Sequence, residues 1–488
     1  MNMQAEVRNK YRAVIGLEVH VQLLTNSKIF CGDETQFGVA PNTQLSVISL
    51  AHPGTLPKLN KRALEYAIRM GLACQSEISR LNIFDRKNYF YPDLPKGYQI
   101  TQDRTPICRG GMVEVTLNDG RPVSIRLNRI HLEEDAGKSI HVEGEPDTLV
   151  DFNRAGMPLI EIVTEPVINT SEAAAAFLTE IRKLVRYLGI SDGNMEEGSL
   201  RCDANVSIMP VNATAFGNKV EIKNMNSFRH VQRAIDVEVE RQITLAERGE
   251  RIISETRTFD ADSGKSYSMR VKEELNDYRY FPDPDLSPVE VTEEWLSSVR
   301  ASMPELPQAL FHKFTTNYKL PAYDARILTE SRQIASYFQE VCRHTTNYKG
   351  VSNWIMGPVK ACLNELTSVE VVFPVKPVIL AELIQLVDTG KLSFSVASQQ
   401  VFPVLIKQSG DSALAVAQQL NVIQESNHDQ LLPVIDEVLK AFPDKIAEYK
   451  KGKKGLKAMF IGEVMKRTRG KADPKITDEL ITRKLQEV

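Results

Sequence analysis

Two segments of the chain alternate between apolar and polar residues, and this pattern predicts two strands that each bury one face. In residues 199–208 the outward positions carry a hydroxyl, a cation, a carboxylate and an amide in line: Ser199, Arg201, Asp203, Asn205 and Ser207. Residues 14–23 alternate in the same way, and their polar positions are Glu18, His20 and Gln22. Two strands that present carboxylates among hydrogen-bonding groups predict a catalytic pocket lined by a sheet.

Helical periodicity predicts two helices among these strands. One begins at residue 170 or 171 and ends before Gly189, and the other runs from about Ser227, a good N-cap residue, to Gly249. Turn signals such as Asn118-Asp119-Gly120 separate the short alternating segments around them. The pattern indicates an α+β domain with a largely antiparallel sheet.

The later part of the chain has a different pattern. Three prolines interrupt residues 278–288, which we interpret as the end of the first domain and a loop that returns to the pocket. From about Trp295 onward the apolar residues fall at helical spacing, and residues 407–411 predict a second boundary. We therefore expect a cradle-like catalytic domain over 1–294, an all-α helical domain over 295–407 and a small α-helical tail domain over 408–488.

Composition agrees with this division and narrows the class of protein. A length of 488 residues suits about three domains, and 42% apolar residues is ordinary for a globular protein. No apolar run is long enough to span a bilayer, and the first residues lack the apolar core of a signal peptide. We expect a cytoplasmic protein with no membrane partner, whose six scattered cysteines are reduced thiols.

Charge is concentrated at the end of the chain. From Ala441 onward there are 13 Lys and Arg against 7 Asp and Glu, a net charge of +6. Lys453, Lys454 and Lys457 belong to this run. A basic end on a mildly acidic protein is typical of contact with nucleic acid, although a solvated surface helix would give the same composition.

Two Gly-Lys-Ser segments resemble phosphate-binding loops only superficially. A P-loop needs a glycine five positions before its second glycine, and those positions hold Leu132 and Phe259. Any nucleotide site in this chain must therefore be of another type.

Acidic residues are better candidates for chemistry. Three adjacent acids occupy residues 133–135, and Glu161 interrupts an almost continuous apolar strand, where a buried carboxylate must be paired or bound to metal. Oxygen ligands with one histidine suit Mg²⁺. For any one of these acids a structural salt bridge is a commoner role than metal binding, but the whole set suggests a shared site: Glu18, His20, Glu134, Glu161 and Asp203.

Residues 84–102 interleave cations with aromatic rings. The cations are Arg86, Lys87 and Lys96, and the rings include Tyr89, Tyr91 and Tyr98. Cations meet phosphates and rings meet bases, so the segment could line a site for a single-stranded RNA end. An aromatic core strand followed by a proline-rich loop would give the same pattern.

Several long motifs together resemble the B subunit of the aspartyl/glutamyl-tRNA(Asn/Gln) amidotransferase. The resemblance covers nearly the whole chain, and the motifs fall in the family's order: Gly16 to His20, Phe84 to Gln102, His131 to Ser139, Asn153 to Glu161, Glu196 to Asn205 and Glu221 to Ser227. Residues 454–466 are similar to the family's small tail module.

This resemblance implies a ligase activity. ATP phosphorylates the side-chain carboxylate of Glu or Asp misacylated on tRNA(Gln) or tRNA(Asn), and ammonia then displaces the phosphate. A partner amidase (glutaminase) makes the ammonia from glutamine, and a small third protein completes a heterotrimer. The rival hypothesis is a non-catalytic chain that serves the complex as a tRNA-binding scaffold.

The resemblance also implies roles for particular residues. It places the catalytic groups at Glu18, His20, Glu134 and Asp203, and the magnesium ligands at His20, Glu134, Glu161 and Asp203. Arg86, Lys87 and Lys96 would hold ATP phosphates or the tRNA 3′ end, with tRNA contacts at Tyr89, Tyr91, Tyr98, Lys453, Lys454 and Lys457.

Many members of this family carry a zinc site made of two cysteine pairs, and this chain departs from that pattern. It keeps Cys31, but Asp33, Ser46 and Ser49 stand at the other three positions. We do not expect four-cysteine zinc binding. We expect packing around Phe37, Pro41 and Pro53 to hold this loop instead.

Overall fold

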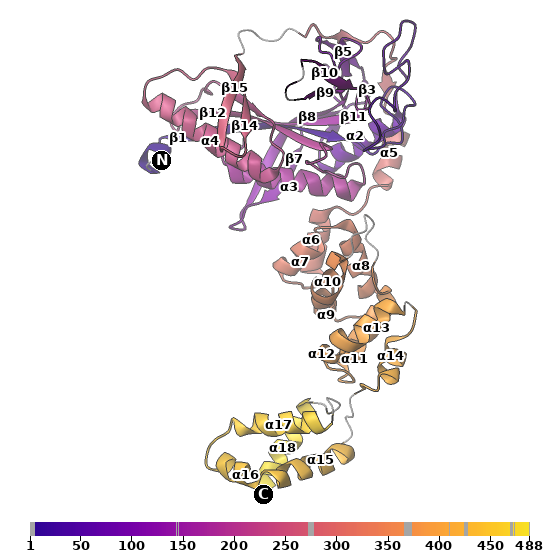
Figure 1. Ribbon diagram of the computed structural model, residues 1–488, viewed down its shortest axis with the longest axis vertical. Helices are drawn as coiled ribbons and strands as arrows, with labels where there is room; N and C mark the ends of the chain where they lie inside the picture. Colours follow the sequence, from indigo (N-terminus) through magenta and orange to yellow (C-terminus); the bar gives the residue numbers. More distant parts are fainter. Residues whose placement is uncertain are drawn as a thin grey trace. The chain divides into compact units, whose positions relative to one another are not determined.

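The computed structural model forms two compact units, Met1–Leu306 and Pro307–Val488 (Figure 1). The structure describes residues 5–142, 144, 146–271, 278–365, 373–408, 410–423, 428–468, 472 and 474–487. The first unit contains both predicted alternating strands, and the elements named among the described residues of the second unit are all helices. The predicted α+β class is confirmed.

A ten-stranded sheet organises the first unit. Its strands follow the order β15-β14-β13-β12-β1-β11-β8-β6-β2, and β7 pairs with β8 in addition. All pairs are antiparallel except β13 with β14. The strands of this sheet are β1 (Tyr11–Gln22), β2 (Glu77–Ile78), β6 (Cys108–Arg109), β7 (Met112–Thr116), β8 (Pro122–Glu134), β11 (Pro158–Thr164), β12 (Leu200–Pro210), β13 (Val220–Lys223), β14 (Glu255–Asp260) and β15 (Lys265–Val271).

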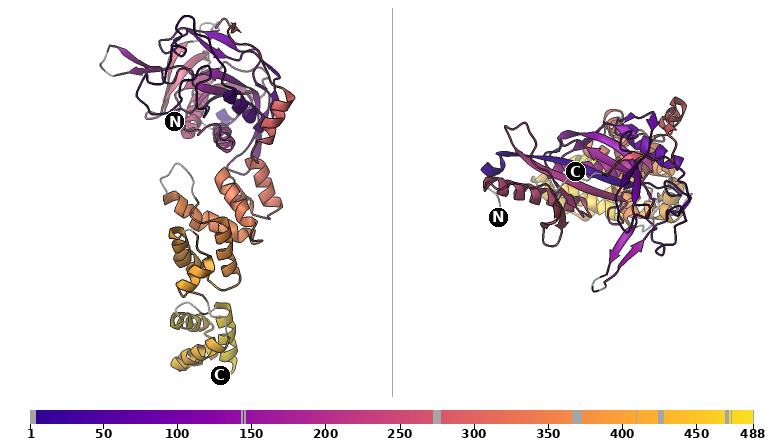
Figure 2. Two further views of the ribbon diagram at one scale, coloured as in Figure 1. Left: turned by 90° about the vertical axis from the view of Figure 1, so that its right-hand side faces the viewer. Right: turned by 90° about the horizontal axis from the view of Figure 1, so that it is seen from above.

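Helices cover the apolar face of this sheet. The core joins residues of β1, β8, β11 and β12 to α2 (Lys61–Ala73), α3 (Ser171–Leu188) and α4 (Phe228–Glu247), so these helices form one layer against the sheet (Figures 1 and 2). The predicted helix limits are confirmed to within a residue or two. Ser227 caps α4 by accepting the amide of His230 at 3.1 Å, and Gly189 ends α3 in the left-handed conformation.

Smaller sheets lie beside the main one. β9 (Lys138–His141) pairs with β10 (Thr148–Asp151), β17 (Val289–Glu290) pairs with β3 (Leu81–Asn82), and β4 (Asp85–Asn88) lies between β16 (Phe281–Pro282) and β5 (Tyr98–Thr101). The proline-rich segment therefore returns to the aromatic and basic segment. Short α1 (Ala5–Arg8) precedes β1, and α5 (Glu293–Ala301) packs on α2 within the first unit.

The expectation that Phe37, Pro41 and Pro53 pack to hold the loop between β1 and α2 is wrong. All three residues are exposed, and Phe37 leaves 69% of its surface open to solvent. The loop is tied by hydrogen bonds instead. Asn153 Oδ1 accepts the amides of Thr43 and Gln44 at 2.8 and 2.9 Å. Other hydrogen bonds converge on the carboxylate of Asp33 within the loop.

The second unit is made of helices, several of them short. They are α6 (Pro307–Thr316), α7 (Ala322–Leu328), α8 (Arg332–Cys342), α9 (Tyr348–Trp354), α10 (Lys360–Glu365), α11 (Pro377–Asp388), α12 (Phe394–Val396), α13 (Phe402–Lys407), α14 (Ala413–Gln419), α15 (His428–Ala441), α16 (Pro443–Lys450), α17 (Leu456–Arg467) and α18 (Pro474–Glu487), with π-helical turns at Ile355–Val359 and Ala397–Val401. Helices α15, α17 and α18 bury a core of their own around Phe460 and Ile481. Across the described residues, no helix combines the length and the apolar character that crossing a bilayer requires.

The layer of helices should control the stability of the first unit. Phe177 of α3 is fully buried in the core, and replacing it with alanine leaves a cavity that should lower the free energy of unfolding by about 3–5 kcal/mol. Chemical denaturation followed by tryptophan fluorescence checks this. The substitution Phe37→Ala is the matched control and should change the free energy by less than about 0.5 kcal/mol, because Phe37 is exposed.

Candidate active site

The register of the central strands brings distant polar residues onto one face of the sheet. Glu18 of β1 lies opposite Asp203 of β12, and His20 lies opposite Glu161 of β11. Glu161 in turn lies opposite His131 of β8. Directly paired residues of antiparallel strands share a face, so the predicted acids on β1, β11 and β12 line one surface.

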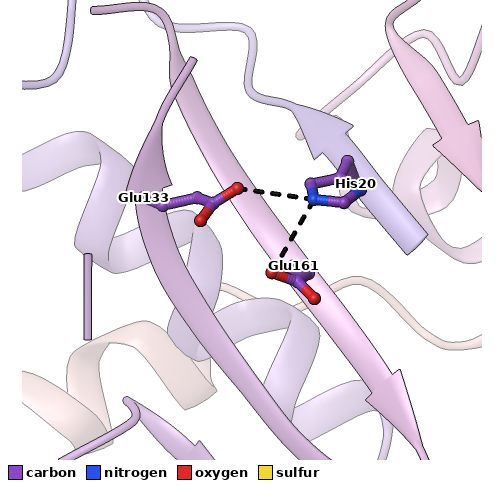
Figure 3. Close-up of side chains that lie close together, drawn as sticks. All are labelled: His20, Glu133 and Glu161. Atoms are coloured by element: carbon purple, nitrogen blue, oxygen red, sulfur yellow. Dashed lines mark ion pairs between the residues drawn. The ribbon is translucent and has the colours of Figure 1, made fainter. Parts of the chain in front are cut away.

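The first of two groups on this face contains His20, Glu133 and Glu161 (Figure 3). His20 Nε2 lies 3.4 Å from Glu133 Oε1 and 3.7 Å from Glu161 Oε2. His131 approaches the same two carboxylates, at 3.2 Å from Glu161 and 3.8 Å from Glu133. The side chains of Glu133 and His131 are each 4% exposed, so charges here interact through little water.

Opposite charges set the ionisation of this group. Burial alone would lower the pKa of His20, but its hydrogen bond to Glu133 and the charges of Glu161 and Glu133 outweigh burial and raise the pKa to about 9. Burial would raise the pKa of Glu161, but His131 and His20 hold it at about 2. The pKa of Glu133 is likewise held well below its usual range, against burial, by His131 and His20. At neutral pH the two glutamates of this group are therefore ionised and face the protonated imidazole of His20.

The second group contains Glu18, Asp203 and Glu221, the last on β13. Lys223 Nζ lies 2.5 Å from Asp203 and 3.1 Å from Glu221, and Asn205 donates to Glu18 at 2.9 Å. Burial and the neighbouring charges of Glu161, Glu221 and Asp203 raise the pKa of Glu18. Glu18 is therefore crowded by acids on both sides and links the two groups electrostatically.

Both groups have the donor chemistry of a divalent-cation site. In each, one ligand atom per residue lies within 4.8 Å of the others. Carboxylate oxygens suit Mg²⁺, and in the second group Lys223 pairs with two of the three carboxylates, Asp203 and Glu221. In the first group, binding through His20 would require the imidazole to release its proton. The residues present fit a magnesium ion.

The structure places Glu134 apart from these groups. Its carboxylate forms an ion pair with Lys96 and accepts the amide of Ile100 at 2.8 Å. Glu133 and Glu134 are neighbours on β8, so they point to opposite faces. Glu133 is therefore the member of the acidic run that faces His20.

Several residues that lie in the quoted motifs but were not among the predicted site residues complete the site: Glu133, His131, Glu221, Lys223 and Asp135. Asp135 Oδ2 accepts hydrogen bonds from Gln22 at 3.0 Å and from Arg201 at 2.9 Å, which tie the end of β8 to β1 and β12. Residues two apart in a strand share a face, so counting alternate positions along β8 from His131 would have selected Glu133. The Glu-Ile-Lys pattern of Glu221 to Lys223 was a weaker signal because the strand is only four residues long.

The three predicted phosphate contacts have different surroundings. Arg86 is paired at 2.8 Å with both Asp283 and Asp285, and its guanidinium lies 4.2 Å from the Tyr98 ring centroid. Lys96 pairs with Glu134. Burial would lower the pKa of Lys87, but the charges of Glu133, Tyr280 and Glu161 raise it, so Lys87 is the member of the three whose charge interacts with the first acidic group.

The predicted tRNA contacts are also spread over different environments. Tyr89 packs edge-on against Tyr91 and Tyr278, and Tyr91 is 60% exposed. In the second unit Lys453 pairs with Glu448 at 3.0 Å and Lys457 with Asp478 at 2.8 Å. Lys454 lies over the ring of Tyr449 at 4.5 Å.

Comparison with known proteins agrees with this architecture. Residues 13–297, which contain the sheet and both acidic groups, match the family model described as "GatB/GatE catalytic domain". Residues 336–485 match the model described as "GatB domain". The first unit therefore belongs to a class of catalytic domains, and the second carries a domain found with it.

Relatives match along the whole length of the chain. The chain is 48% identical over 478 residues to the aspartyl/glutamyl-tRNA(Asn/Gln) amidotransferase B subunit of Thermodesulfovibrio yellowstonii, covering 98% of this chain and 100% of that protein. For the protein of the same name from Trichodesmium erythraeum, identity is 47% over 496 residues, with 100% of both chains covered. The chain belongs to the family of aspartyl/glutamyl-tRNA(Asn/Gln) amidotransferase B subunits.

The ionisation of His20 predicts a pH dependence of stability. Its folded pKa of about 9 lies above the value of 6.5 expected when unfolded, so its stabilising interactions are fully present below pH 6.5 and are lost as the pH rises through about 9. The loss should be on the order of 2 kcal/mol. Denaturant unfolding of wild type and of His20→Gln, at about pH 6.5 and about pH 9.5, measures it. Equal pH effects in both proteins would contradict the prediction.

Proposed function

We propose that this chain is the member of an aminoacyl-tRNA amidotransferase complex that activates and amidates the substrate. The carboxylate of Glu or Asp misacylated on tRNA attacks the γ-phosphorus of ATP, and ADP leaves. Ammonia then attacks the carbonyl carbon of the acyl phosphate, inorganic phosphate leaves, and the amide remains on the tRNA. A partner amidase would supply the ammonia from glutamine, and a small third protein would complete the heterotrimer.

The observation that carries this proposal is the pair of acidic groups on one sheet face. An anionic carboxylate and a triphosphate repel each other, and Mg²⁺ would supply positive charge that lets them approach. Glu18, Asp203 and Glu221, or His20, Glu133 and Glu161, would hold such an ion. A protein that only bound tRNA would have no use for carboxylates gathered in this way.

Cations of the chain itself would balance the negative charge that remains on the phosphates and the reacting carboxylate. Lys87 interacts through its charge with Glu133 and Glu161, and its ammonium lies 5.0 Å from the Tyr278 ring centroid. We infer that Lys87 contacts a phosphate oxygen or the reacting carboxylate, because a cation beside the developing charge stabilises the transition state. Asp135 and Arg201 act as positioning residues by joining β8 to β12 at 2.9 Å.

Substitutions of Glu133 and of Glu134 distinguish the catalytic carboxylate assigned from the structure from the one predicted from the sequence. Glu133→Gln should lower ATP-dependent amidation by about a hundredfold or more, because it removes a carboxylate from the first acidic group. Glu134→Gln should lower it less, because Glu134 pairs with Lys96. Both are assayed in the purified complex with misacylated tRNA, ATP and glutamine.

The matched control is Glu165→Gln, just beyond β11, whose carboxylate accepts from Asn128 at 2.8 Å. It should retain activity, and every variant should retain assembly with the amidase and its basal glutaminase activity. If Glu134→Gln alone were inactive, Glu134 would be the catalytic carboxylate. Full amidation in Glu133→Gln and in Asp203→Asn would favour the tRNA-binding scaffold.

The basic end of the chain should contact the tRNA backbone. Lys454→Ala should weaken tRNA binding and reduce the slope of log K against log salt by about 1, as expected for one lost phosphate contact. Lys445, which pairs with Glu448 at 2.9 Å, provides the control Lys445→Ala. Filter binding at several salt concentrations measures the slope, and identical slopes in wild type and Lys454→Ala would remove Lys454 from the interface.

A further inference from the structure

The loop between β1 and α2 contains a compact polar cluster. Its four members are Cys31, Asp33, Ser46 and Ser49, which we call the Asp33 cluster. The Asp33 Oδ2 atom accepts the amide of Ser46 at 3.0 Å, the hydroxyl of Ser46 at 3.1 Å and the hydroxyl of Ser49. Cys31 Sγ lies 3.4 Å from Ser49 Oγ. One carboxylate oxygen thus joins chain segments that are 13 and 16 residues apart.

Backbone hydrogen bonds hold Asp33 at this place. Ser27 and Glu34 form an antiparallel bridge, and the amide of Lys28 donates to the carbonyl of Asp33 at 2.9 Å. The chain therefore reverses direction between Lys28 and Asp33. The opposite side of the cluster comes from Ser46 to Ser49, where the Ser46 hydroxyl also accepts the amide of Ile48 at 3.3 Å.

The charge of the cluster is stabilised internally. Burial would raise the pKa of Asp33, but hydrogen bonds from Ser49, Ser46 and Cys31 and the charge of Lys28 lower it. Burial raises the pKa of the Cys31 thiol, which favours its protonated form. The anion of the cluster is therefore the Asp33 carboxylate, which is stabilised by neutral hydrogen-bond donors and by the charge of the buried Lys28.

These donors do not suit zinc, although the same four positions would carry two cysteine pairs in relatives with a zinc site. Structural zinc sites use four thiolate or imidazole ligands. Here the set is one protonated thiol, two hydroxyls and one carboxylate. We propose that the Asp33 cluster closes this loop without a metal ion. We also propose that its four side chains still meet closely enough for cysteines at the same positions to bind zinc.

The cluster also fixes the wall of a pocket. Ile48, between the two serines, lines an opening of about 170 Å³ together with Phe30, His52, Lys96, Tyr98 and Asp285. Ser49 itself lines an adjoining hollow that reaches Glu134 and Asp135. Loss of the cluster should therefore loosen a surface close to the end of β8, while the acidic groups on the sheet face stay in place.

Cysteines introduced at positions 33, 46 and 49 test whether the loop holds the geometry of a four-cysteine site. The full-length variant D33C/S46C/S49C, together with native Cys31, should bind about one zinc per chain, as four thiolates are a complete structural site. Wild type should retain none after gel filtration, as measured by mass spectrometry of the metal. The control D119C/S263C/S297C adds the same number of thiols at three exposed, separated positions and should bind none.

A folded D33C/S46C/S49C variant without zinc would overturn the preserved geometry, and a stoichiometric zinc ion in wild type would overturn metal-free closure. Folding is verified for both by circular dichroism and by a cooperative denaturation transition.

The reactivity of Cys31 tests the wild-type cluster directly. Asp33→Ala should raise the alkylation rate of Cys31, mapped by peptide mass spectrometry, by about tenfold, because the loop loses a charge-assisted anchor. Asp119→Ala, which removes another turn carboxylate, is the matched control and should leave the rate unchanged. Chelator should not alter the wild-type rate. An unchanged rate in Asp33→Ala, or a chelator effect as large as that substitution, would overturn the proposal.

Discussion

The antiparallel register of β1 between β12 and β11 is the constraint on which the rest of the site depends. It sets Glu18 against Asp203 and His20 against Glu161. A shift by one residue would move every one of these side chains to the helix-covered face. That shift is prevented because the alternate residues, including Leu17, Val19 and Cys202, are buried against α2, α3 and α4. The apolar core therefore determines where the carboxylates meet.

Gathering acids on one face has an electrostatic cost, and the structure offsets it unevenly. In the first group His20 and His131 both lie close to Glu133 and Glu161, and the pKa values of the two glutamates are lowered despite burial. In the second group Lys223 contacts Asp203 and Glu221, whereas Glu18 has an amide partner and a raised pKa. A cation bound near Glu18 would thus be stabilised by charge that the protein leaves uncompensated, which makes the two groups unequal as binding sites.

Local patterns in the sequence predicted local structure well. Alternation identified both faces of β1 and β12, and the cap residues identified the ends of α3 and α4, because these signals act within a few residues. Pairing between strands was not predictable in the same way. Glu221 meets Glu18 only through the pairing of β13 with β12, and the choice of Glu133 over Glu134 depends on how far β8 stays regular. The Asp33 cluster joins residues within a loop that has no periodic pattern, so its hydrogen bonds could not be predicted, although the resemblance had already grouped the same four positions as those of a zinc site.

Basic residues that look equivalent along the chain become distinct through their partners. Arg86 is committed to Asp283 and Asp285 of the segment that returns to β4, where it joins two distant parts of the first unit. Lys96 is committed to Glu134 beside the pocket. Lys87, on the same strand as Arg86 but on its opposite face, interacts through its charge with Glu133 and Glu161. One strand therefore contributes a cation to structure on one side and a cation to the acidic face on the other, so the alternation that separates Glu133 from Glu134 also separates Lys87 from Arg86.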